Sequence, residues 1–321
     1  MRIVVVGTIV VDTIEVPDGS VEESLGGIAH TVSTLAATAA GAHTIIPLCR
    51  IGEDCRGRIQ DWAARLPGVS LEAVLPINQL NARVQLSYAE GGREGERVER
   101  LTHPPLPLTE KDVEAAAGAD AVIVNCITGR DCTMGAMRTL RASCDRIYLD
   151  VHSLSLGTAA DGSRHYRRRD DWWSWLECAD VVQCNLPEAA TICSLDPTST
   201  GAVHATAAVE KMLQRASSGD GSFSGQSGLE VWLLTLGDEG AVVFDRRGAK
   251  VAVTHVPAPS IDVVDPTGAG DAFGAGYACA WLNGDNPVDA TRVAVCSGSV
   301  ACASIGVPPV VDFQKGLSVL I

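Results

Sequence analysis

Short runs of Val, Ile and Leu recur along the chain, separated by stretches rich in Ala and other small residues. The runs lie at residues 2–6, 121–125, 146–150, 181–184 and 231–235. Residues 26–40 have the pattern of a helix that stops at Gly41, and glycine commonly ends a helix. Regular alternation of strands and helices is typical of a parallel sheet covered by helices. The pattern therefore predicts an α/β fold, which we assign to one domain over residues 1–321.

A second pattern stands apart from this alternation. Residues 83–88 alternate polar and apolar side chains, the apolar ones being Val84, Leu86 and Tyr88. A period of two is the pattern of a strand with one buried face. Residues 13–25 are polar and short-stranded, and residues 96–101 follow a Gly-Gly turn as a returning strand. We expect residues 12–25 and 72–101 to form a small outlying β-sheet.

Composition narrows the range of partners. Of the 321 residues, 46% are hydrophobic and 20% are charged, which suits a chain that buries a large core. The formal net charge of -14 makes the surface repel polyanions, and no basic stripe is present, so we expect no nucleic-acid partner. Any phosphate site must then depend on backbone N–H groups, a helix N-terminus and bound cations.

The cysteines and the lengths of the apolar runs indicate the cellular compartment of the protein. The 11 cysteines form no Cys-x-x-Cys pair and several lie in apolar runs, among them Cys126, Cys184, Cys279 and Cys302. This usage indicates buried reduced thiols and a cytoplasmic protein. Gly7, Thr8 and Asp12 interrupt the first apolar run, which we interpret as a core strand, and no run approaches the roughly 18 apolar residues that cross a membrane.

The strongest chemical motif lies near the C-terminus. It reads Asp265-Pro266-Thr267-Gly268-Ala269-Gly270-Asp271-Ala272-Phe273 and leads into a small-residue helical stretch. Gly268, Ala269 and Gly270 leave room for a phosphate to approach bare backbone, and a helix start directs unpaired N–H groups at it. Asp271 follows directly, where a carboxylate can accept the proton of an attacking hydroxyl.

Three other interpretations compete with this one: a helix cap, a dinucleotide-binding turn and a Walker loop. Asp271 alone could be a helix cap. A dinucleotide-binding turn is excluded because Phe273 occupies its third glycine position and the motif lies far from the first strand. A Walker loop is excluded because no Gly-Lys-Ser/Thr follows.

The motif resembles the C-terminal signature of the ribokinase-like (PfkB) carbohydrate kinases, Asp-Thr/Pro-x-Gly/Ala-Ala-Gly-Asp-x-Phe, and further family landmarks occur in order from about Gly7 to Val307. The resemblance implies a doubly wound, mainly parallel sheet flanked by helices, with the small sheet as a lid. It also implies ATP-dependent phosphorylation of a hydroxyl on a small sugar-like substrate. Asp271 would be the catalytic base, and residues 268–270 would stabilise the transferring phosphoryl group.

Near the N-terminus the resemblance extends to the acceptor. Gly26 and Gly27 resemble the family's early Gly-Gly segment, where backbone lies close to the sugar. Asp12, five residues after Gly7, matches a carboxylate that accepts hydrogen bonds from two sugar hydroxyls. Thr31 stands where the family usually carries Asn, a departure that argues against ribose itself. Taken alone, these residues could equally be a strand-end acid and a closely packed helix start.

For the nucleotide, Asn185-Leu186-Pro187-Glu188 matches the family's Asn-x-x-Glu motif, which organises Mg²⁺, water and ATP phosphates. Asn185 and Glu188 also suit a helix capping box, and both roles are compatible. The turn with Thr235, Gly237 and Gly240 resembles one that borders the nucleotide, although a plain hairpin turn would look similar. Asp265 and Thr267 match positions where relatives hold a monovalent cation, for which K⁺ is the candidate.

Three other features receive structural interpretations. The basic cluster at residues 164–169 is interpreted as a solvated face, and the Trp172, Trp173 and Trp175 group as helix packing. His152 lacks ligand spacing to another His or Cys, so no zinc site is expected. The Gly/Ser-rich residues 217–228 are interpreted as a mobile surface loop.

Two alternatives to a sugar kinase stay open: a nucleoside kinase of the same fold, and a non-catalytic sensor of sugars or nucleotides. A small isolated sheet exposes its edges and its apolar face to water. We therefore expect a homodimer joined through the lids, as in many members of the family that the chain resembles.

Overall fold

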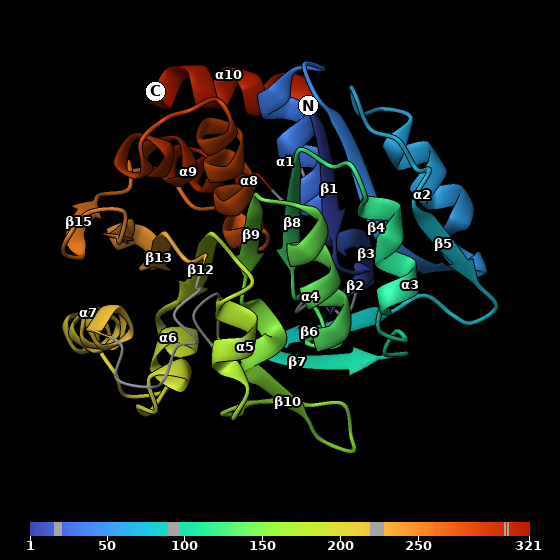
Figure 1. Ribbon diagram of the computed structural model, residues 1–321. Helices are drawn as coiled ribbons and strands as arrows, with labels where there is room; N and C mark the ends of the chain where they lie inside the picture. Colours follow the sequence, from blue (N-terminus) through green and yellow to red (C-terminus); the bar gives the residue numbers. More distant parts are fainter. Residues whose placement is uncertain (16–20, 89–96, 219–227, 305, 307) are drawn as a thin grey trace.

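The computed structural model describes residues 1–15, 21–88, 97–218, 228–304, 306 and 308–321. At its centre lies a nine-stranded sheet in the order β15-β14-β13-β12-β9-β8-β1-β4-β5 (Figure 1). Neighbours from β5 to β13 run parallel, while β14 and β15 are each antiparallel to the preceding strand in the chain. The strands are β1 (Arg2–Val6), β4 (Thr44–Gly52), β5 (Val74–Ile77), β8 (Ala121–Asn125), β9 (Ile147–Asp150), β12 (Val181–Asn185), β13 (Val231–Thr235), β14 (Ala241–Asp245) and β15 (Ala252–Val256). The α/β prediction is confirmed.

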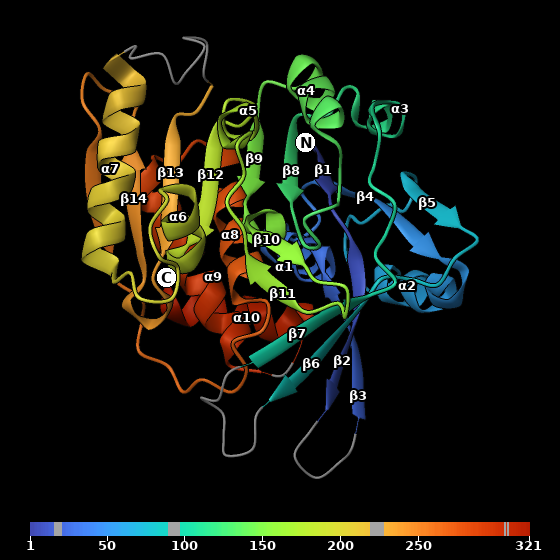
Figure 2. The same ribbon diagram turned by 90° about the horizontal axis from the view of Figure 1, so that it is seen from below.

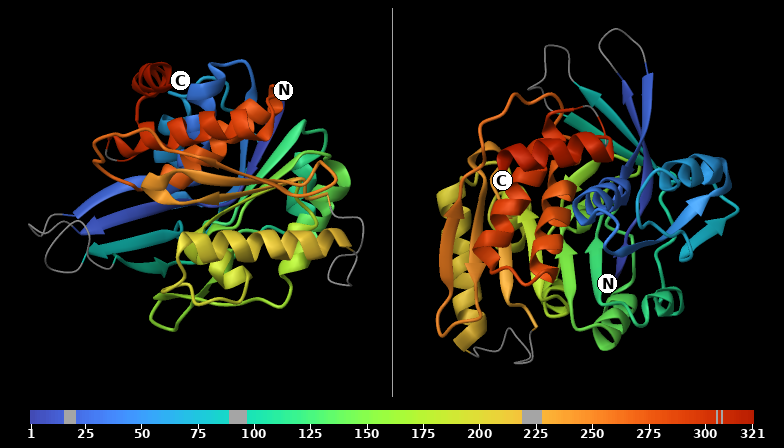
Figure 3. Two further views of the ribbon diagram at one scale, coloured as in Figure 1. Left: turned by 90° about the vertical axis from the view of Figure 1, so that its left-hand side faces the viewer. Right: turned by 90° about the horizontal axis from the view of Figure 1, so that it is seen from above.

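Helices cover both faces of this sheet, as the left view of Figure 3 shows for α7 and for the pair α8 and α9. The first face carries α1 (Ile28–Ala39), α2 (Arg56–Ala63), α8 (Ala269–Leu282) and α9 (Pro287–Cys302), with α10 (Val310–Leu320) packed on α1 and α9. The second face carries α3 (Glu110–Val113), α4 (Met134–Ser143), α5 (Trp172–Leu176), α6 (Leu186–Ile192) and α7 (Ala202–Ser218). Short 3-10 turns are η1 (Glu53–Cys55), η2 (Glu114–Ala116), η3 (His152–Ser155) and η4 (Gly237–Glu239).

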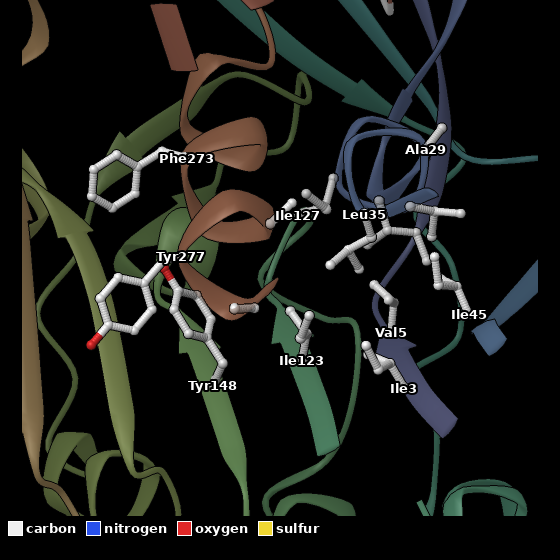
Figure 4. Close-up of a cluster of buried hydrophobic side chains, with 14 of the residues drawn as sticks. Ile3, Val5, Ala29, Leu35, Ile45, Ile123, Ile127, Tyr148, Phe273 and Tyr277 are labelled. Carbon is white, nitrogen blue, oxygen red and sulfur yellow. The ribbon is translucent and has the colours of Figure 1, made fainter. Parts of the chain in front are cut away.

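Strand β1 shows why the strands read as unbroken apolar runs. Ile3 and Val5 belong to the core cluster of the first face, whereas Val4 and Val6 belong to that of the second. A parallel strand covered on both sides must be apolar at every position, because successive side chains point to opposite faces. Figure 4 shows Ile3 and Val5 with Ile45, Ile123 and Leu35 in the first of these clusters.

A smaller four-stranded sheet, in the order β3-β2-β6-β7, projects beyond the edge of the large one (Figure 2). Its strands are β2 (Ile9–Glu15), β3 (Val21–Gly27), β6 (Arg83–Tyr88) and β7 (Arg97–Thr102). We expected residues 72–101 to belong here, and for β5 this was wrong. Strand β4 continues past the end of β1, and its residues Cys49 to Gly52 pair with β5, which therefore extends the large sheet.

A hairpin that the sequence did not suggest lies beside the small sheet. Strands β10 (Leu156–Thr158) and β11 (Arg164–Tyr166) pair antiparallel, and a bridge from Arg100 to Ser163 joins the hairpin to β7. Figure 2 shows β11 alongside β7. The chain thus returns from the middle of the large sheet to border the small one.

The structure also bears on the predictions made for the tryptophans, the cysteines, membrane spans and the Gly/Ser-rich loop. Trp172 and Trp175 are buried in the second core cluster, so the tryptophan group packs a helix as predicted. All eleven cysteines are free thiols. Within the described ranges, no helix has both the length and the apolarity that crossing a membrane requires. Most of the loop at 217–228 lies outside the described residues.

One buried amide ties the two sheets together. Asn81 accepts a hydrogen bond from the Gly52 N–H at 3.0 Å, where β4 ends, and donates one to the Ile9 carbonyl at 2.9 Å, where β2 begins. Its own N–H donates to Asp54 Oδ1 at 2.8 Å. Asn81 therefore joins the start of β2, in the small sheet, to the end of β4, in the large sheet.

Asn81→Ala is expected to lower the free energy of unfolding by about 1–3 kcal/mol, because it leaves a buried N–H and a buried carbonyl without their side-chain partner. Denaturant unfolding would measure the change. Asn78→Ala, at an exposed position three residues earlier, is the matched control and should be nearly neutral. Equal effects of the two substitutions would contradict the anchoring role of Asn81.

Candidate functional site

A cavity of about 720 Å³ opens where the parallel strands end. Asp150, Asn185 and Thr235 close strands β9, β12 and β13 and all line it. In open α/β sheets, ligands bind beyond these carboxyl ends. The small sheet contributes Asp12 and Val84 to the lining, and the hairpin contributes residues 163–166. The cavity thus lies between the large sheet, the small sheet and the start of α8.

Nine of the residues predicted from the sequence line this cavity: Asp12, Gly27, Asn185, Glu188, Thr235, Thr267, Gly268, Gly270 and Asp271. Six predicted residues do not: Gly26, Thr31, Gly237, Gly240, Asp265 and Ala269. Gly26 and Thr31 support lining residues from behind, as described below. Segments that are far apart in the chain therefore converge on one site.

Asp271 occupies the first turn of α8, after Gly268, whose φ of 79° is left-handed. Its carboxyl is buried and its Oδ1 accepts hydrogen bonds from Asn125 Nδ2 at 2.6 Å and Thr31 Oγ1 at 3.3 Å. Burial raises the pKa of Asp271 to about 7, although both hydrogen bonds oppose that rise. A carboxyl with a pKa near neutral pH is suited to accept a proton.

Two of the other carboxyl groups that line the cavity, those of Glu188 and Asp150, also have raised pKa values. Burial raises the pKa of Glu188 to about 8. Burial, and then the nearby Glu188 and Asp271 carboxylates, raise the pKa of Asp150 well above its usual range. Asp150 and Asn125 were not predicted as site residues, although both end strands that the sequence indicates. A cation bound among these acids would favour their ionised forms.

Asn185 and Glu188 form the capping box that the sequence suggested. Asn185 Oδ1 accepts from the Glu188 N–H at 3.0 Å, and Glu188 Oε2 accepts from the Asn185 N–H at 2.8 Å. Glu188 Oε1 also accepts from Asn185 Nδ2 at 2.9 Å. The box turns the end of β12 directly into α6 and holds the Glu188 carboxyl at the cavity wall.

Gln183, on β12, is a residue that the sequence analysis missed. Its Nε2 donates to the Gly270 carbonyl at 3.0 Å and lies 3.4 Å from Asp150 Oδ2, while its Oε1 accepts from the Tyr148 hydroxyl. A Cβ on Gly274 would come within 2.8 Å of the same Oε1. Gln183 therefore holds the first turn of α8 against the sheet. Figure 4 shows Tyr148 beside Tyr277 of α8.

On the opposite wall, glycine allows the chain to pass the Asp12 carboxyl. A Cβ on Gly26 would lie 1.7 Å from Asp12 Oδ2, so no other residue fits there without displacing that carboxyl. Gly27 follows with a left-handed φ of 62° and opens α1. Asp12 itself is buried and lines the cavity.

The basic cluster at 164–169 was interpreted as a solvated face, and for Arg164 this was wrong. The Arg164 side chain is only 5% exposed and lines the cavity. It donates to the Ile127 carbonyl at 3.2 Å and to Ser153 Oγ, and lies 3.8 Å from the Glu99 carboxylate. These contacts, made to distant segments, bind the hairpin to the cavity rim. Nothing in the local sequence signals them.

The proposed cation ligands are close together in the chain and in space. Asp265 Oδ1 accepts from the Thr267 N–H at 2.9 Å, and the Thr267 hydroxyl is buried with no hydrogen-bond partner among the described residues. Across the same ranges, no three His, Cys, Asp or Glu side chains group as metal ligands. The monovalent cation therefore stays a prediction.

The sequence model of the pfkB family of carbohydrate kinases matches residues 163–310, which include α8 and Asp271. Over this part of the chain, the sequence is similar to that family. Among relatives, the bifunctional protein HldE of Caulobacter sp. (strain K31) is 34% identical over 91 residues, 28% of this chain and 18% of that protein. Aminoimidazole riboside kinase of Salmonella typhimurium is 45% identical over 49 residues, 15% of this chain and 14% of that protein. The chain spans less than a fifth of the length of either relative.

Solved structures of ribokinase-like proteins match the whole chain. Ribokinase of Arabidopsis thaliana, solved with ribose and ATP, has a TM-score of 0.71 at 19% identity and covers 98% of both chains. A pyrophosphate-dependent kinase of the ribokinase family, solved with a pyrophosphate analogue and myo-inositol, has a TM-score of 0.75 at 18% identity over 98% of this chain and 99% of that chain. At such identities the likeness establishes the fold of the family.

Asp271→Asn is expected to change how stability depends on pH. The pKa of Asp271 is about 7 in the fold and near 4 when unfolded, so its stabilising contribution is complete below pH 4 and is lost as pH rises through 7. Asn keeps the acceptor for Asn125 and cannot ionise. The variant should therefore gain stability relative to the parent between pH 4 and 7, by at most about 4 kcal/mol.

Denaturant unfolding at several pH values measures this difference. Asp285→Asn, at an exposed position after the end of the same helix, is the control and should follow the parent at every pH. A difference between Asp271→Asn and the parent that is constant with pH would show that Asp271 is ionised throughout.

Proposed function

We propose that this protein transfers the γ-phosphoryl group of ATP to a hydroxyl of a small sugar-like molecule held between Asp12 and Asp271. The observation that carries the proposal is the position of Asp271. A buried carboxyl with a raised pKa follows directly on a glycine turn at the start of a helix and faces a cavity of about 720 Å³. A proton acceptor is thereby placed beside a group of backbone N–H donors.

The reaction follows from this arrangement. The ionised Asp271 carboxylate accepts the proton of the acceptor hydroxyl, and the hydroxyl oxygen attacks the γ-phosphorus. The bond from that phosphorus to the bridging oxygen breaks, and ADP leaves with the bonding pair. The Ala269 N–H already donates to the Pro266 carbonyl at 3.2 Å. The N–H groups of the next two residues have no partner within the helix, so they stabilise the charge that develops on the phosphoryl oxygens.

Magnesium is part of the proposal, and the residues present fit it. Mg²⁺ is usually held by one or two carboxylates, several waters and the substrate phosphates, whose charge it neutralises. Asp150, Glu188 and Asn185 would hold it here. Because both Glu188 oxygens already accept hydrogen bonds from Asn185, we expect Glu188 to act through water. Asp265 and the Thr267 carbonyl are the proposed ligands of K⁺, and the buried Thr267 hydroxyl beside them has no hydrogen-bond partner among the described residues.

The acceptor is proposed to be a polyhydroxylated molecule because Asp12, when ionised, only accepts hydrogen bonds. A nucleoside is the alternative acceptor of the same reaction, and aminoimidazole riboside kinase is one of the relatives that the chain matches. A non-catalytic sensor is the remaining alternative. A sensor has no need of a proton acceptor beside a phosphate site, so the burial of Asp271 favours the kinase.

Asp271→Asn is expected to separate catalysis from nucleotide binding. Phosphoryl transfer should fall by about 10²–10⁴, the usual cost of losing a general base. ADP affinity should stay close to that of the parent, because the backbone of residues 268–270 is unaltered. A panel of sugars, cyclitols and nucleosides, with ATP and with pyrophosphate as donors, would first identify the acceptor; calorimetry would measure ADP binding.

The outcomes of this assay distinguish the proposals. If Asp271→Asn transfers phosphate at the parent rate, the base is another residue. If the parent protein is inert toward the whole panel yet binds its members, the sensor is supported instead.

Asp12→Ala is expected to weaken acceptor binding by about 10-fold or more and to leave ATP affinity unchanged, since hydrogen bonds to a charged group contribute about 1.5–3 kcal/mol each. Calorimetric titration with the acceptor found in the panel measures it. Asp61→Ala, at an exposed position on α2, is the matched control. Unchanged acceptor affinity in Asp12→Ala would show that Asp12 does not bind the acceptor.

Because Thr31 stands where the family usually carries Asn, we also expect poor activity on ribose, which the same panel of acceptors measures.

We further propose a cytoplasmic homodimer that pairs through the small sheet, which acts as a lid. The free thiols support a reducing compartment. The hairpin β10–β11 borders β7, whereas β3 is the other outer strand of the small sheet and so offers an edge for a second copy. Light scattering should give twice the chain mass of 33.5 kDa at micromolar concentration. A mass that stays at the monomer value as concentration rises would contradict the dimer.

A further inference from the structure

His30 is a cavity residue that neither the motifs nor the mechanism above uses. It is the third residue of α1 and is only 6% exposed, yet it lines the cavity together with Thr267 and Gly268. Its Nε2 is buried and has no hydrogen-bond partner among the described residues. Leaving a buried polar atom unpaired costs about 1–3 kcal/mol, so such an atom in a folded protein requires an explanation.

The imidazole lies against the glycine turn at the start of α8. A Cβ on Gly268 would come within 2.4 Å of His30 Nδ1 and 2.8 Å of its Cε1, so the ring could not occupy this place beside any other residue. The next residue of α1, Thr31, holds the Asp271 carboxyl. Consecutive side chains of α1 therefore contact the two ends of the same turn, His30 at Gly268 and Thr31 at Asp271.

We propose that His30 Nε2 donates a hydrogen bond to an oxygen of the phosphoryl group that is transferred, and so adds a side-chain donor to the backbone donors of the α8 turn. This rests on the proposed kinase function. It gives the orphaned nitrogen a partner and explains why an imidazole is buried against Gly268. It also places the phosphoryl group over the α8 turn, within reach of an acceptor hydroxyl that Asp271 deprotonates.

The protonation state of His30 is consistent with this role. Burial lowers the pKa of His30 to about 4, although the nearby Asp265 opposes that change, so the ring is neutral near pH 7. A neutral imidazole carries one N–H donor, which must be on Nε2 for the proposed contact. It supplies a hydrogen bond to the phosphoryl group without adding a charge to the free protein.

The test compares His30→Ala, which removes the donor, with His30→Gln, which retains a side-chain N–H. His204→Ala, at an exposed position on α7, is the matched control. With the acceptor found in the panel, His30→Ala should lower kcat by about 10²–10³, as removal of an oxyanion donor does elsewhere, and should leave the acceptor KM nearly unchanged. His30→Gln should recover part of kcat. A residue that only packs would lower the melting temperature and leave kcat unaltered.

A second readout needs no activity and no known acceptor. Inorganic pyrophosphate serves as the probe, and ¹⁵N-histidine spectra of the parent protein report on Nε2, with His30→Gln identifying the resonance. Addition of pyrophosphate should shift the Nε2 signal of His30, and His30→Ala should bind pyrophosphate about 10-fold or more weakly. His204→Ala should bind it as the parent does.

The two readouts separate the two proposals. If the parent transfers phosphate to no acceptor, the kinase function fails, while the pyrophosphate experiment still decides whether His30 contacts phosphate. If His30→Ala folds and retains both kcat and pyrophosphate affinity, the role of His30 is overturned. Should His30→Ala fail to fold, an Nε2 signal that pyrophosphate does not shift overturns it as well.

Discussion

The burial of the Asp271 carboxyl is the constraint on which the rest of the site depends. Removing a carboxyl from water favours its neutral form, and here hydrogen bonds from two side chains oppose that tendency, Asn125 from the end of β8 and Thr31 from α1. Both residues lie far from Asp271 in the chain and meet it only when α1 and α8 pack together on the same face of the sheet. The proton affinity of Asp271 is thus set by the tertiary packing rather than by its local motif.

Two glycines, Gly26 and Gly268, allow close contacts that make this packing specific. Gly26 lets β3 pass the Asp12 carboxyl, where a Cβ would lie 1.7 Å from an oxygen, and Gly268 admits the His30 ring at the start of α8. A side chain at either glycine would displace a polar group of the cavity. Together they set the spacing between the wall that carries Asp12 and the wall that carries Asp271. The absence of side chains at these positions therefore shapes the site as much as the carboxyls do.

Local patterns were sufficient to predict five of the parallel strands (β1, β8, β9, β12 and β13), the helix after the glycine turn and the capping box of Asn185, but not β4. Asn125 and Asp150 could also have been found, since the carboxyl ends of parallel strands meet at one edge of a sheet. Gln183 and His30 could not, because each lies within a regular element and becomes part of the site through a distant partner. Arg164 was misjudged for the same reason: its contacts to Ile127 and Glu99 are not encoded near residue 164. β5 was misplaced because a short strand does not indicate which edge it joins.

The cavity combines features that oppose one another until ligands are bound. Asp150, Glu188 and Asp271 concentrate potential negative charge beside a turn built to attract anions, in a chain whose net charge is -14. A nucleotide entering alone would be attracted by the α8 turn and repelled by the ionised acids. A cation among the acids would remove the repulsion, and it would also favour their ionised forms, which the proposed role of Asp271 as a base requires. Binding of cation and nucleotide should therefore be mutually favourable, and by linkage each must strengthen the other by the same factor. The raised pKa values of the acids are then a property of the free protein, which a bound cation would reverse.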